Sequence, residues 1–325
     1  MSSRALSAHP LSASDEGRWA ALTAGHGTIF NTIEWTSLFG PNLQRIGLYD
    51  AGGDLRGGFC VWQQRKYGLR VLRNPPFTPH IGPFYAPKAI NVSARSDEQR
   101  AVLEAMAEYL SQRTAAVFRL NLSLGINDCL PFYWRGWKVV PHYTYRINLT
   151  QDENALWEAL SKERRNDVRK AQKDKLIAEK TADTGAMRAL VTETYARHDK
   201  SFPRTAMANI LSNWPPGENS YCYLSWLDGR PIACVYVVHD SHTAYYLMGG
   251  YSEGAHHGAG ALAMWHAILR AKELGMRVFD FEGSNVPSIE RYFRGFGGTL
   301  TPYIGVHKAW LPVEMALKLR YRNLF

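Results

Sequence analysis

Two acidic residues near the end of the chain have the spacing of a carboxylate pair that could move protons. Asp280 and Glu282 alternate within Val278 to Ser284, an apolar stretch typical of a buried strand. Side chains two apart on a strand share one face, so we expect both carboxyl groups at one edge of a sheet. A buried acid needs a partner or a chemical role. We expect the pair to orient or deprotonate an acceptor amine; the alternative is an ion pair with Arg291 or Arg294.

A strongly basic segment, Arg164 to Lys175, is the second candidate for chemistry. On a helix, Arg165, Arg169 and Lys173 lie at i, i+4 and i+8 and therefore on one face. Such a face could hold the phosphates of a nucleotide, a tRNA or coenzyme A through paired hydrogen bonds from arginine. The alternative is an ordinary solvated helix surface.

A glycine-rich turn, Ala255 to Ala261, separates a predicted strand from a predicted amphipathic helix. Gly258 and Gly260 would let backbone N–H groups approach an anion at the start of that helix, where the helix dipole adds attraction. The alternative is a plain helix-entry turn. We expect Tyr246 and Tyr251, which precede the turn, to line the same site, although strand tyrosines also serve as packing residues.

The adjacent His256 and His257 do not form a metal site by themselves. Neighbouring residues cannot face one side of a helix together, and no matching cluster of Cys, Asp or Glu accompanies them. We therefore expect no bound metal ion.

The chain contains an internal repeat that places these residues in its second half. Val117 to Ser123 matches Val278 to Ser284 at an offset of 161 residues, and Tyr133 to Trp137 matches Tyr292 to Phe296 at an offset of 159. Where the second copy has Asp280 and Glu282, the first has Arg119 and Asn121. This difference favours the second copy as the site of chemistry.

Each half shows the same order of predicted elements. An amphipathic helix precedes each matched strand, with Val102, Met106 and Leu110 in one half and Leu262, Trp265 and Ile268 in the other. Upstream, each half has two apolar runs with the spacing of a hairpin. The pattern predicts an α+β fold of two domains, each a mixed sheet flanked by helices, covering residues 1–150 and 151–325 with the boundary near Thr150.

Three stretches of the second half resemble a known family: Ser161 to Ala171, Phe279 to Ser284 and Tyr292 to Gly298. They are similar to the Fem-like (FemABX) branch of the GNAT acyltransferase superfamily, and the repeat fits its tandem GNAT-like domains. The resemblance implies that Tyr292 and Phe293 contact the donor. It also implies that Arg294, where Fem-type enzymes often have lysine, holds a donor carbonyl or phosphate.

The resemblance implies an N-acyltransferase or aminoacyltransferase with no tightly bound cofactor. We favour acyl-CoA as the co-substrate over aminoacyl-tRNA, because the long helical hairpin common in Fem-type enzymes that act on tRNA has no heptad-patterned counterpart here. The acceptor would be an amine of a small molecule, a lipid or a cell-wall precursor. A tRNA-dependent aminoacyltransferase is the alternative enzyme, and a non-catalytic module that binds anions is the alternative of another class.

Composition agrees with a globular protein that binds an anionic partner. The 325 residues are 46% hydrophobic and 21% charged, with a formal net charge of +9. Four scattered cysteines, and the lack of a leader or membrane-spanning pattern, predict a cytoplasmic protein. The basic amphipathic segment 310–325 is expected to dock on the protein, with peripheral membrane contact as the alternative.

Overall fold

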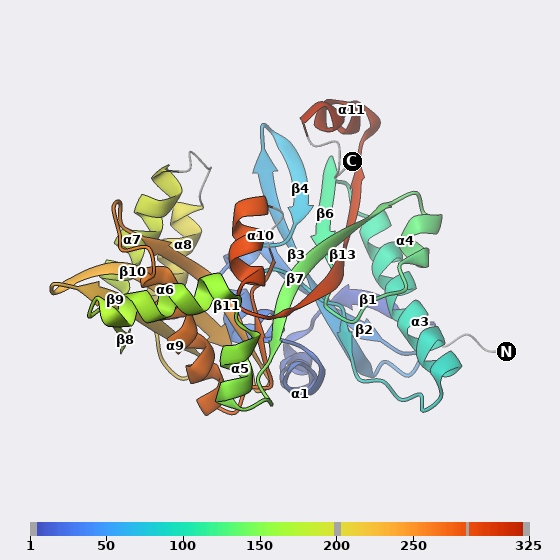
Figure 1. Cartoon of the computed structure of the whole chain (residues 1–325). Helices are drawn as coiled ribbons and strands as arrows, with labels where there is room; N and C mark the ends of the chain where they lie inside the picture. Colours follow the sequence, from blue (N-terminus) through green and yellow to red (C-terminus); the bar gives the residue numbers. More distant parts are fainter. Residues whose placement is uncertain (1–4, 198–202, 284–285, 321–325) are drawn as a thin grey trace. The chain divides into compact units, whose positions relative to one another are not determined.

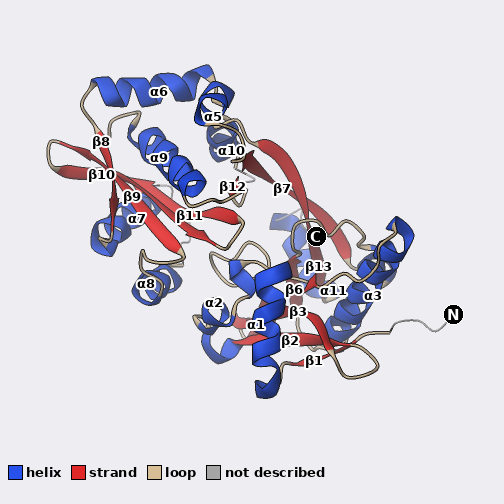
Figure 2. Ribbon diagram, turned by 90° about the horizontal axis from the view of Figure 1, so that it is seen from below, coloured by secondary structure: helices blue, strands red, loops and turns tan. Residues whose placement is uncertain are grey.

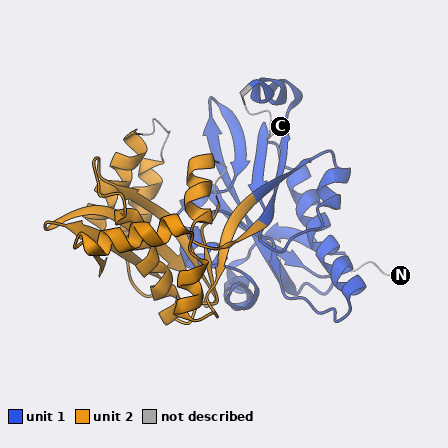
Figure 3. Ribbon diagram, viewed as in Figure 1, with its two compact units in different colours: residues 1–142, 302–325 blue, residues 143–301 orange. Residues whose placement is uncertain are grey.

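The computed structural model describes residues 5–197, 203–283 and 286–320, which form two compact units (Figure 3). Unit 1 comprises residues 1–142 together with 302–325, and unit 2 comprises residues 143–301. The repeat boundary expected at Thr150 remains a prediction about the duplication. In space, the end of the chain joins unit 1 because Gly305 to Ala309 pair antiparallel with Val117 to Asn121.

Unit 1 is built on a mixed sheet with the strand order β1-β2-β3-β4-β6-β13, and β5 pairs with β3 (Figure 1). Its strands are β1 (Ser7–Pro10), β2 (Leu43–Tyr49), β3 (Leu55–Lys66), β4 (Leu69–Arg73), β5 (Phe84–Tyr85), β6 (Val117–Asn121) and the end of β13 (Thr299–Ala309). Its helices are α1 (Glu16–His26), α2 (Ile33–Ser37), α3 (Val92–Ser111), α4 (Leu130–Trp134) and α11 (Leu311–Arg320). The predicted core positions Val102, Met106 and Leu110 of α3 are buried.

In unit 2 the strands follow the order β7-β12-β11-β10-β9-β8, again with both parallel and antiparallel neighbours. Its strands are β7 (Lys138–Asn148), which starts in unit 1, β8 (Ile177–Thr181), β9 (Ser220–Leu227), β10 (Arg230–His239), β11 (Thr243–Tyr251) and β12 (Val278–Asp280). Its helices are α5 (Glu153–Ala159), α6 (Lys162–Lys173), α7 (Thr184–Arg197), α8 (Arg204–Asn213), α9 (Ala259–Glu273) and α10 (Pro287–Arg294).

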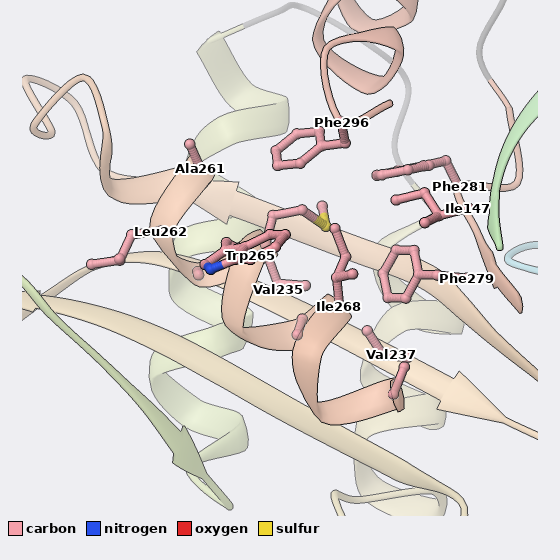
Figure 4. Close-up of a cluster of buried hydrophobic side chains, with 14 of the residues drawn as sticks. Ile147, Val235, Val237, Ala261, Leu262, Trp265, Ile268, Phe279, Phe281 and Phe296 are labelled. Carbon is pink, nitrogen blue, oxygen red and sulfur yellow. The ribbon is translucent and has the colours of Figure 1, made fainter. Parts of the chain in front are cut away.

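Helices cover both faces of the unit 2 sheet, with α9 on one face and α7 on the other (Figure 2). Val235 and Val237 of β10 pack with Trp265 and Ile268 of α9 (Figure 4), whereas the thiol of Cys234 lies against the Met187 carbonyl of α7. Alternate residues of one strand therefore serve the two helical layers. Helix α9 is apolar nearly all round because α6 covers its other side, through Val168 and Ala171.

The two units repeat one topological unit, as the sequence predicts. In each, a long helix connects two parallel strands: α3 leads to β6 beside β4, and α9 leads to β12 beside β11. A short helix and an antiparallel strand follow in both copies. The prediction of an α+β fold with mixed strand pairing flanked by helices is confirmed. Among the described residues, no helix combines the length and the apolar character needed to cross a membrane.

Two glycines of unit 2 offer a test of how tightly α10 packs. Gly297 and Gly275 both follow a helix with φ of +81°, but a Cβ on Gly297 would lie 2.4 Å from the Ala159 carbonyl oxygen, whereas a Cβ on Gly275 meets nothing within 4 Å. We predict that Gly297→Ala lowers the free energy of unfolding by about 2–4 kcal/mol and Gly275→Ala by about 1 kcal/mol. Urea denaturation followed by tryptophan fluorescence measures both, and equal losses would contradict the packing argument.

Candidate active site

The site begins where the parallel strands β11 and β12 separate. They pair only between Thr243–Tyr245 and Val278–Asp280, after which β11 continues to Tyr251 while the chain turns away from β12. The turn uses left-handed backbone at Glu282 (φ 57°) and Gly283 (φ 80°). A Cβ on residue 283 would lie 2.1 Å from the Tyr143 carbonyl oxygen, so only glycine fits there.

This turn corrects the expectation that Asp280 and Glu282 share a strand face. The strand ends at Asp280, before Phe281 to Gly283 of the predicted run, because the Glu282 N–H donates to the Asp280 carboxylate at 2.8 Å instead of continuing the ladder; Ser284 lies outside the described residues. Left-handed geometry at a residue other than glycine carries strain of order 1–3 kcal/mol, and such strain gathers at functional sites. The direction of the Glu282 side chain is therefore set by a turn and not by the alternation of residues along a strand.

Asp280 is a buried carboxylate, 1% exposed, with a polar group close to each of its oxygens. One oxygen accepts from the Thr144 hydroxyl at 2.6 Å and from the Glu282 N–H, and the other lies 3.1 Å from Nε of Arg146. Burial raises the pKa of Asp280, and the bonds from Thr144 and Arg146 oppose that rise. An ion pair does form, as in the alternative interpretation, but its partner is Arg146 of β7 and not Arg291 or Arg294.

Glu282 carries the uncommitted carboxyl group of the site. Its Oε1 is buried and has no hydrogen-bond partner within the described part of the chain. Burial raises the pKa of Glu282 well above its ordinary value, and the negative charge of Asp280 raises it further. A carboxyl group in this state binds a proton far more tightly than one in water, which is what a proton acceptor at neutral pH requires.

Aromatic side chains gather beside this carboxyl group. The ring of Tyr246 lies 6.4 Å from Phe281 and 5.6 Å from Phe293, and Phe281 stacks on Phe293 at 4.8 Å between centroids. Phe293 is only 6% exposed and belongs to the core. Burial is the main reason that the pKa of Tyr246 is raised, with a smaller effect from Glu282. Tyr246 therefore keeps its proton and can donate a hydrogen bond.

Tyr292 connects α10 with α6 and the start of α9. The Arg164 guanidinium lies over its ring at 4.9 Å, and a Cβ on Gly260 would lie 3.3 Å from its hydroxyl oxygen. Burial raises the pKa of Tyr292, and the nearby Arg164 charge lowers it. The structure thus brings together Tyr292 and Gly260, which the sequence proposed separately, around an arginine that the sequence analysis did not select.

The glycine turn is held against α6 by close packing and by ion pairs. A Cβ on Gly258 would lie 2.2 Å from the Asp167 carbonyl oxygen, so this residue must be small. The Asp167 carboxylate pairs with Arg164 at 2.9 Å and with His257 at 3.1 Å. Burial raises the pKa of Asp167, while the charges of Arg164 and His257 lower it. The turn and the helix therefore form one fixed unit.

His256 completes this contact by pairing with Asp174 at 3.0 Å, and its Nδ1 accepts from the Gly258 N–H. Both histidines thus have ion-pair partners on or next to α6. In the described residues, no group of three or more His, Cys, Asp or Glu side chains could hold a metal ion.

The predicted basic face of α6 is partly used for packing on α5. Arg165 pairs with Glu158 at 2.6 Å and Arg169 lies over the Trp157 ring at 5.4 Å, whereas Lys173 is exposed near the end of the helix. The buried cation is Arg164, at 7% exposure. Its i, i+3 spacing to Asp167 was visible in the sequence and could have indicated an inward ion pair.

Arg294 and Tyr251 lie at the margins of this arrangement. Arg294 is 60% exposed in its side chain and pairs with Glu290 at 3.0 Å; Glu290 also accepts from the Tyr145 hydroxyl at 2.6 Å. Tyr251 is five residues beyond Tyr246, or about 17 Å along an extended strand, and its ring lies under Arg197. The structure does not bring Tyr251 to Glu282.

The residues that sequence reasoning missed are those that support the selected ones. They are Thr144, Tyr145, Arg146, Arg164, Asp167 and Glu290. Strand β7 looked like an ordinary strand, and only its place beside β12 shows that Thr144 and Arg146 face Asp280. No local signal indicated this register.

Comparison with known proteins fits this geometry. A family described as "Acetyltransferase (GNAT) domain" matches residues 160–294, a range that contains α6, the glycine turn, Glu282 and α10. No curated protein matches this chain in sequence.

Solved structures share the fold of nearly the whole chain. FemX has a TM-score of 0.67 at 12% identity, covering 95% of this chain and 99% of its own. The C-terminal domain of a putative lysylphosphatidylglycerol synthetase from Agrobacterium fabrum has 0.59 at 12%, covering 94% and 95%. A tandem GNAT protein from the clavulanic acid biosynthesis pathway has 0.52 at 14%, covering 93% and 98%.

The predicted enzyme class, an N-acyltransferase or aminoacyltransferase, is thereby confirmed, while the comparisons leave the donor and acceptor open. Residues 160–294 are similar to the GNAT acetyltransferase domain family, and the chain as a whole has the fold of FemX and of a tandem GNAT protein.

Proposed function

We propose that unit 2 transfers an acyl group from an activated donor to an amine, with Glu282 as the proton acceptor. The observation that carries this proposal is the buried Oε1 of Glu282, which has no hydrogen-bond partner among residues 5–197, 203–283 and 286–320 and lies at the end of a strained turn held by Asp280. An unsatisfied buried carboxyl group is unfavourable for stability, and a substrate that supplies the missing partner gives it a function. Asp280 is the positioning residue of this pair.

In the proposed reaction, the amine nitrogen attacks the acyl carbonyl carbon, and a C–N bond forms. Glu282 takes one proton from that nitrogen, the C–S bond of the thioester breaks, and the proton passes to the leaving thiolate. Glu282 returns to its starting state, so atoms and charges balance without a covalent enzyme intermediate. Tyr246 and Tyr292, which keep their protons, are candidate hydrogen-bond donors to the developing oxyanion. Arg294 remains a further candidate because its side chain is exposed.

Acyl-CoA is the favoured donor. The longest described helix of unit 2 is α9, with 15 residues, which is short for the hairpin that Fem-type enzymes acting on tRNA commonly insert. We propose that Gly258, Gly260 and Lys173 lie along the phosphate-bearing part of the donor. Arg165 and Arg169 would contribute there only by exchanging their present partners on α5.

Aminoacyl transfer from tRNA is the second candidate function. The fold likeness to FemX and to a putative lysylphosphatidylglycerol synthetase supports it, as does the net charge of +9. On that alternative the acceptor would be an amine or another nucleophile on a cell-wall precursor or a lipid. In either case we propose the cytoplasm as the compartment, because all four cysteines are free and buried.

Replacing the proposed base tests the mechanism. We predict that Glu282→Gln lowers kcat/KM by about 10²–10⁴-fold with little change in donor affinity, because the amide keeps the shape of the side chain but cannot accept the proton. The assay measures thiol release from acetyl-CoA with a panel of amines and, in parallel, amino acid release from charged tRNA. Glu179→Gln, an exposed acid on β8, is the matched control.

A Glu282→Gln activity within three-fold of the parent would remove Glu282 from the mechanism. If neither donor is consumed with any amine, catalysis of this kind is wrong. The non-catalytic alternative then predicts that Arg165→Ala and Arg169→Ala together abolish binding of an anionic partner while Glu282→Gln leaves it intact.

The raised pKa of Glu282 also predicts how stability depends on pH. Because the folded pKa exceeds the unfolded one, the contribution of this group is fully present below the ordinary glutamate pKa and is lost as pH rises toward the folded value. Relative to Glu282→Gln, the free energy of unfolding of the parent should fall by about 1.4 kcal/mol per pH unit above pH 4.5 until the carboxyl group of the folded protein ionises. Urea unfolding of both proteins from pH 4 to pH 8 measures this difference; parallel curves would show that Glu282 is not desolvated.

A further inference from the structure

Helix α11 of unit 1 presents a row of apolar side chains to solvent. Leu311, Met315 and Leu319 are 71%, 62% and 90% exposed and follow one another at intervals of four residues. Such positions lie along one side of a helix. Trp310, just before the helix, is also 50% exposed. An aliphatic row of this kind is unfavourable in water unless another apolar surface covers it.

A neighbouring side of α11 is held by charge. Glu314 pairs with Lys138 at 3.0 Å and with Lys318 at 2.8 Å, and its side chain is 19% exposed. The hydrogen bonds from both lysines hold the pKa of Glu314 below its ordinary value. The helix is thus attached through the side that carries the half-buried Val313, Glu314 and Leu317, which leaves the row Leu311, Met315 and Leu319 facing outward. Docking of the basic segment 310–325, expected from the sequence, is seen in α11 for the side that carries Glu314, whereas residues 321–325 lie outside the described part of the chain.

A basic hairpin lies near this row. Strands β3 and β4 meet at a turn where Tyr67 is 92% exposed and the Lys66 amine lies 5.7 Å from its ring. Directly below the turn, Arg65 and Arg70 stand opposite each other in the antiparallel register. Like charges in that position destabilise a sheet, so an anionic partner would offset a cost built into the hairpin.

Backbone hydrogen bonds connect the hairpin to α11. The Ala116 N–H donates to the Arg70 carbonyl at 2.9 Å, and the Trp310 N–H donates to the Ala116 carbonyl at 3.0 Å. Two strand spacings, about 10 Å, therefore separate the backbone of Arg70 from that of Trp310. In Figure 1 the β3–β4 hairpin and α11 lie at the same end of unit 1. This common surface consists of Arg65, Lys66, Tyr67, Arg70, Trp310, Leu311, Met315 and Leu319.

We propose that this surface binds an anionic lipid bilayer. Aliphatic side chains on α11 suit the acyl boundary, Tyr67 and Trp310 suit the interface between lipid and water, and the hairpin cations suit anionic head groups. RNA would account for the cations but not for three exposed aliphatic residues, because it is bound through charge and stacking. A dimer formed through this surface would bring Arg65 and Arg70 of one copy close to the same arginines of the other. The like charges would repel each other, which disfavours this occupant.

Vesicle sedimentation of the full chain tests the apolar row. We expect binding to vesicles of equal parts phosphatidylcholine and phosphatidylglycerol, and at least about ten-fold weaker binding after combined Leu311→Ser, Met315→Ser and Leu319→Ser substitution. Ile90→Ser with Val92→Ser is the matched control, since these residues are 90% and 82% exposed elsewhere in unit 1. Urea midpoints equal to the parent's confirm that both variants fold.

The cations are tested by Arg65→Gln with Arg70→Gln. We expect this variant to lose most of the preference for anionic over phosphatidylcholine vesicles, and the parent to lose it at high salt. Lys88→Gln with Lys180→Gln removes the same charge from other exposed positions and should leave the preference unchanged.

Three results would overturn the proposal. One is a parent chain that does not bind anionic vesicles, or a triple serine variant that binds them equally well. Another is a parent dimer, seen in sedimentation equilibrium, that the serine variant converts to a monomer without any vesicle binding. The third is binding of an RNA oligonucleotide, lost in Arg65→Gln with Arg70→Gln, in the absence of vesicle binding.

Discussion

The candidate site depends on the buried Asp280 carboxylate and the three groups that satisfy it. Thr144 and Arg146 hold it from β7, and the N–H of Glu282 bonds it from the following turn. A charge at this depth is tolerated only with such partners. Their geometry ends β12, is accompanied by left-handed backbone at Glu282 and Gly283, and leaves the Oε1 of the half-buried Glu282 out of contact with water near the first acid. One structural ion pair thus creates the group that is available for chemistry.

A second set of interactions fixes the opposite part of the site. Helix α6 lies against the glycine turn so closely that Gly258 has no room for a side chain, and the Arg164–Asp167–His257 ion pairs hold the two together. The same arginine stacks on Tyr292 of α10. Helices α6 and α10 therefore meet at one buried guanidinium, so part of the basic segment faces inward instead of forming a solvated surface.

The first copy of the repeat uses the corresponding positions differently. Asn121 aligns with Glu282, and its side-chain N–H donates to the Pro79 carbonyl. Its backbone N–H donates to the Asn74 side chain, whereas the backbone N–H of Glu282 donates to Asp280. Arg119, which aligns with Asp280, is exposed on β6. The duplication preserved the helix–strand–helix–strand order while the polar groups diverged. Such a divergence is expected when packing constrains the apolar positions of both copies and leaves their polar positions free to change.

The sequence by itself determined the elements and their repetition, because these rest on local periodicity. The spacing of Val102, Met106 and Leu110, and of Leu262, Trp265 and Ile268, predicted α3 and α9, and the paired apolar runs predicted the hairpins β2–β3 and β10–β11. Only the tertiary structure decided that Arg146 and not Arg294 partners Asp280, that β12 ends early, and that β13 completes the sheet of unit 1. Those facts depend on which strands become neighbours and in which register, and no local pattern in the chain encodes that choice.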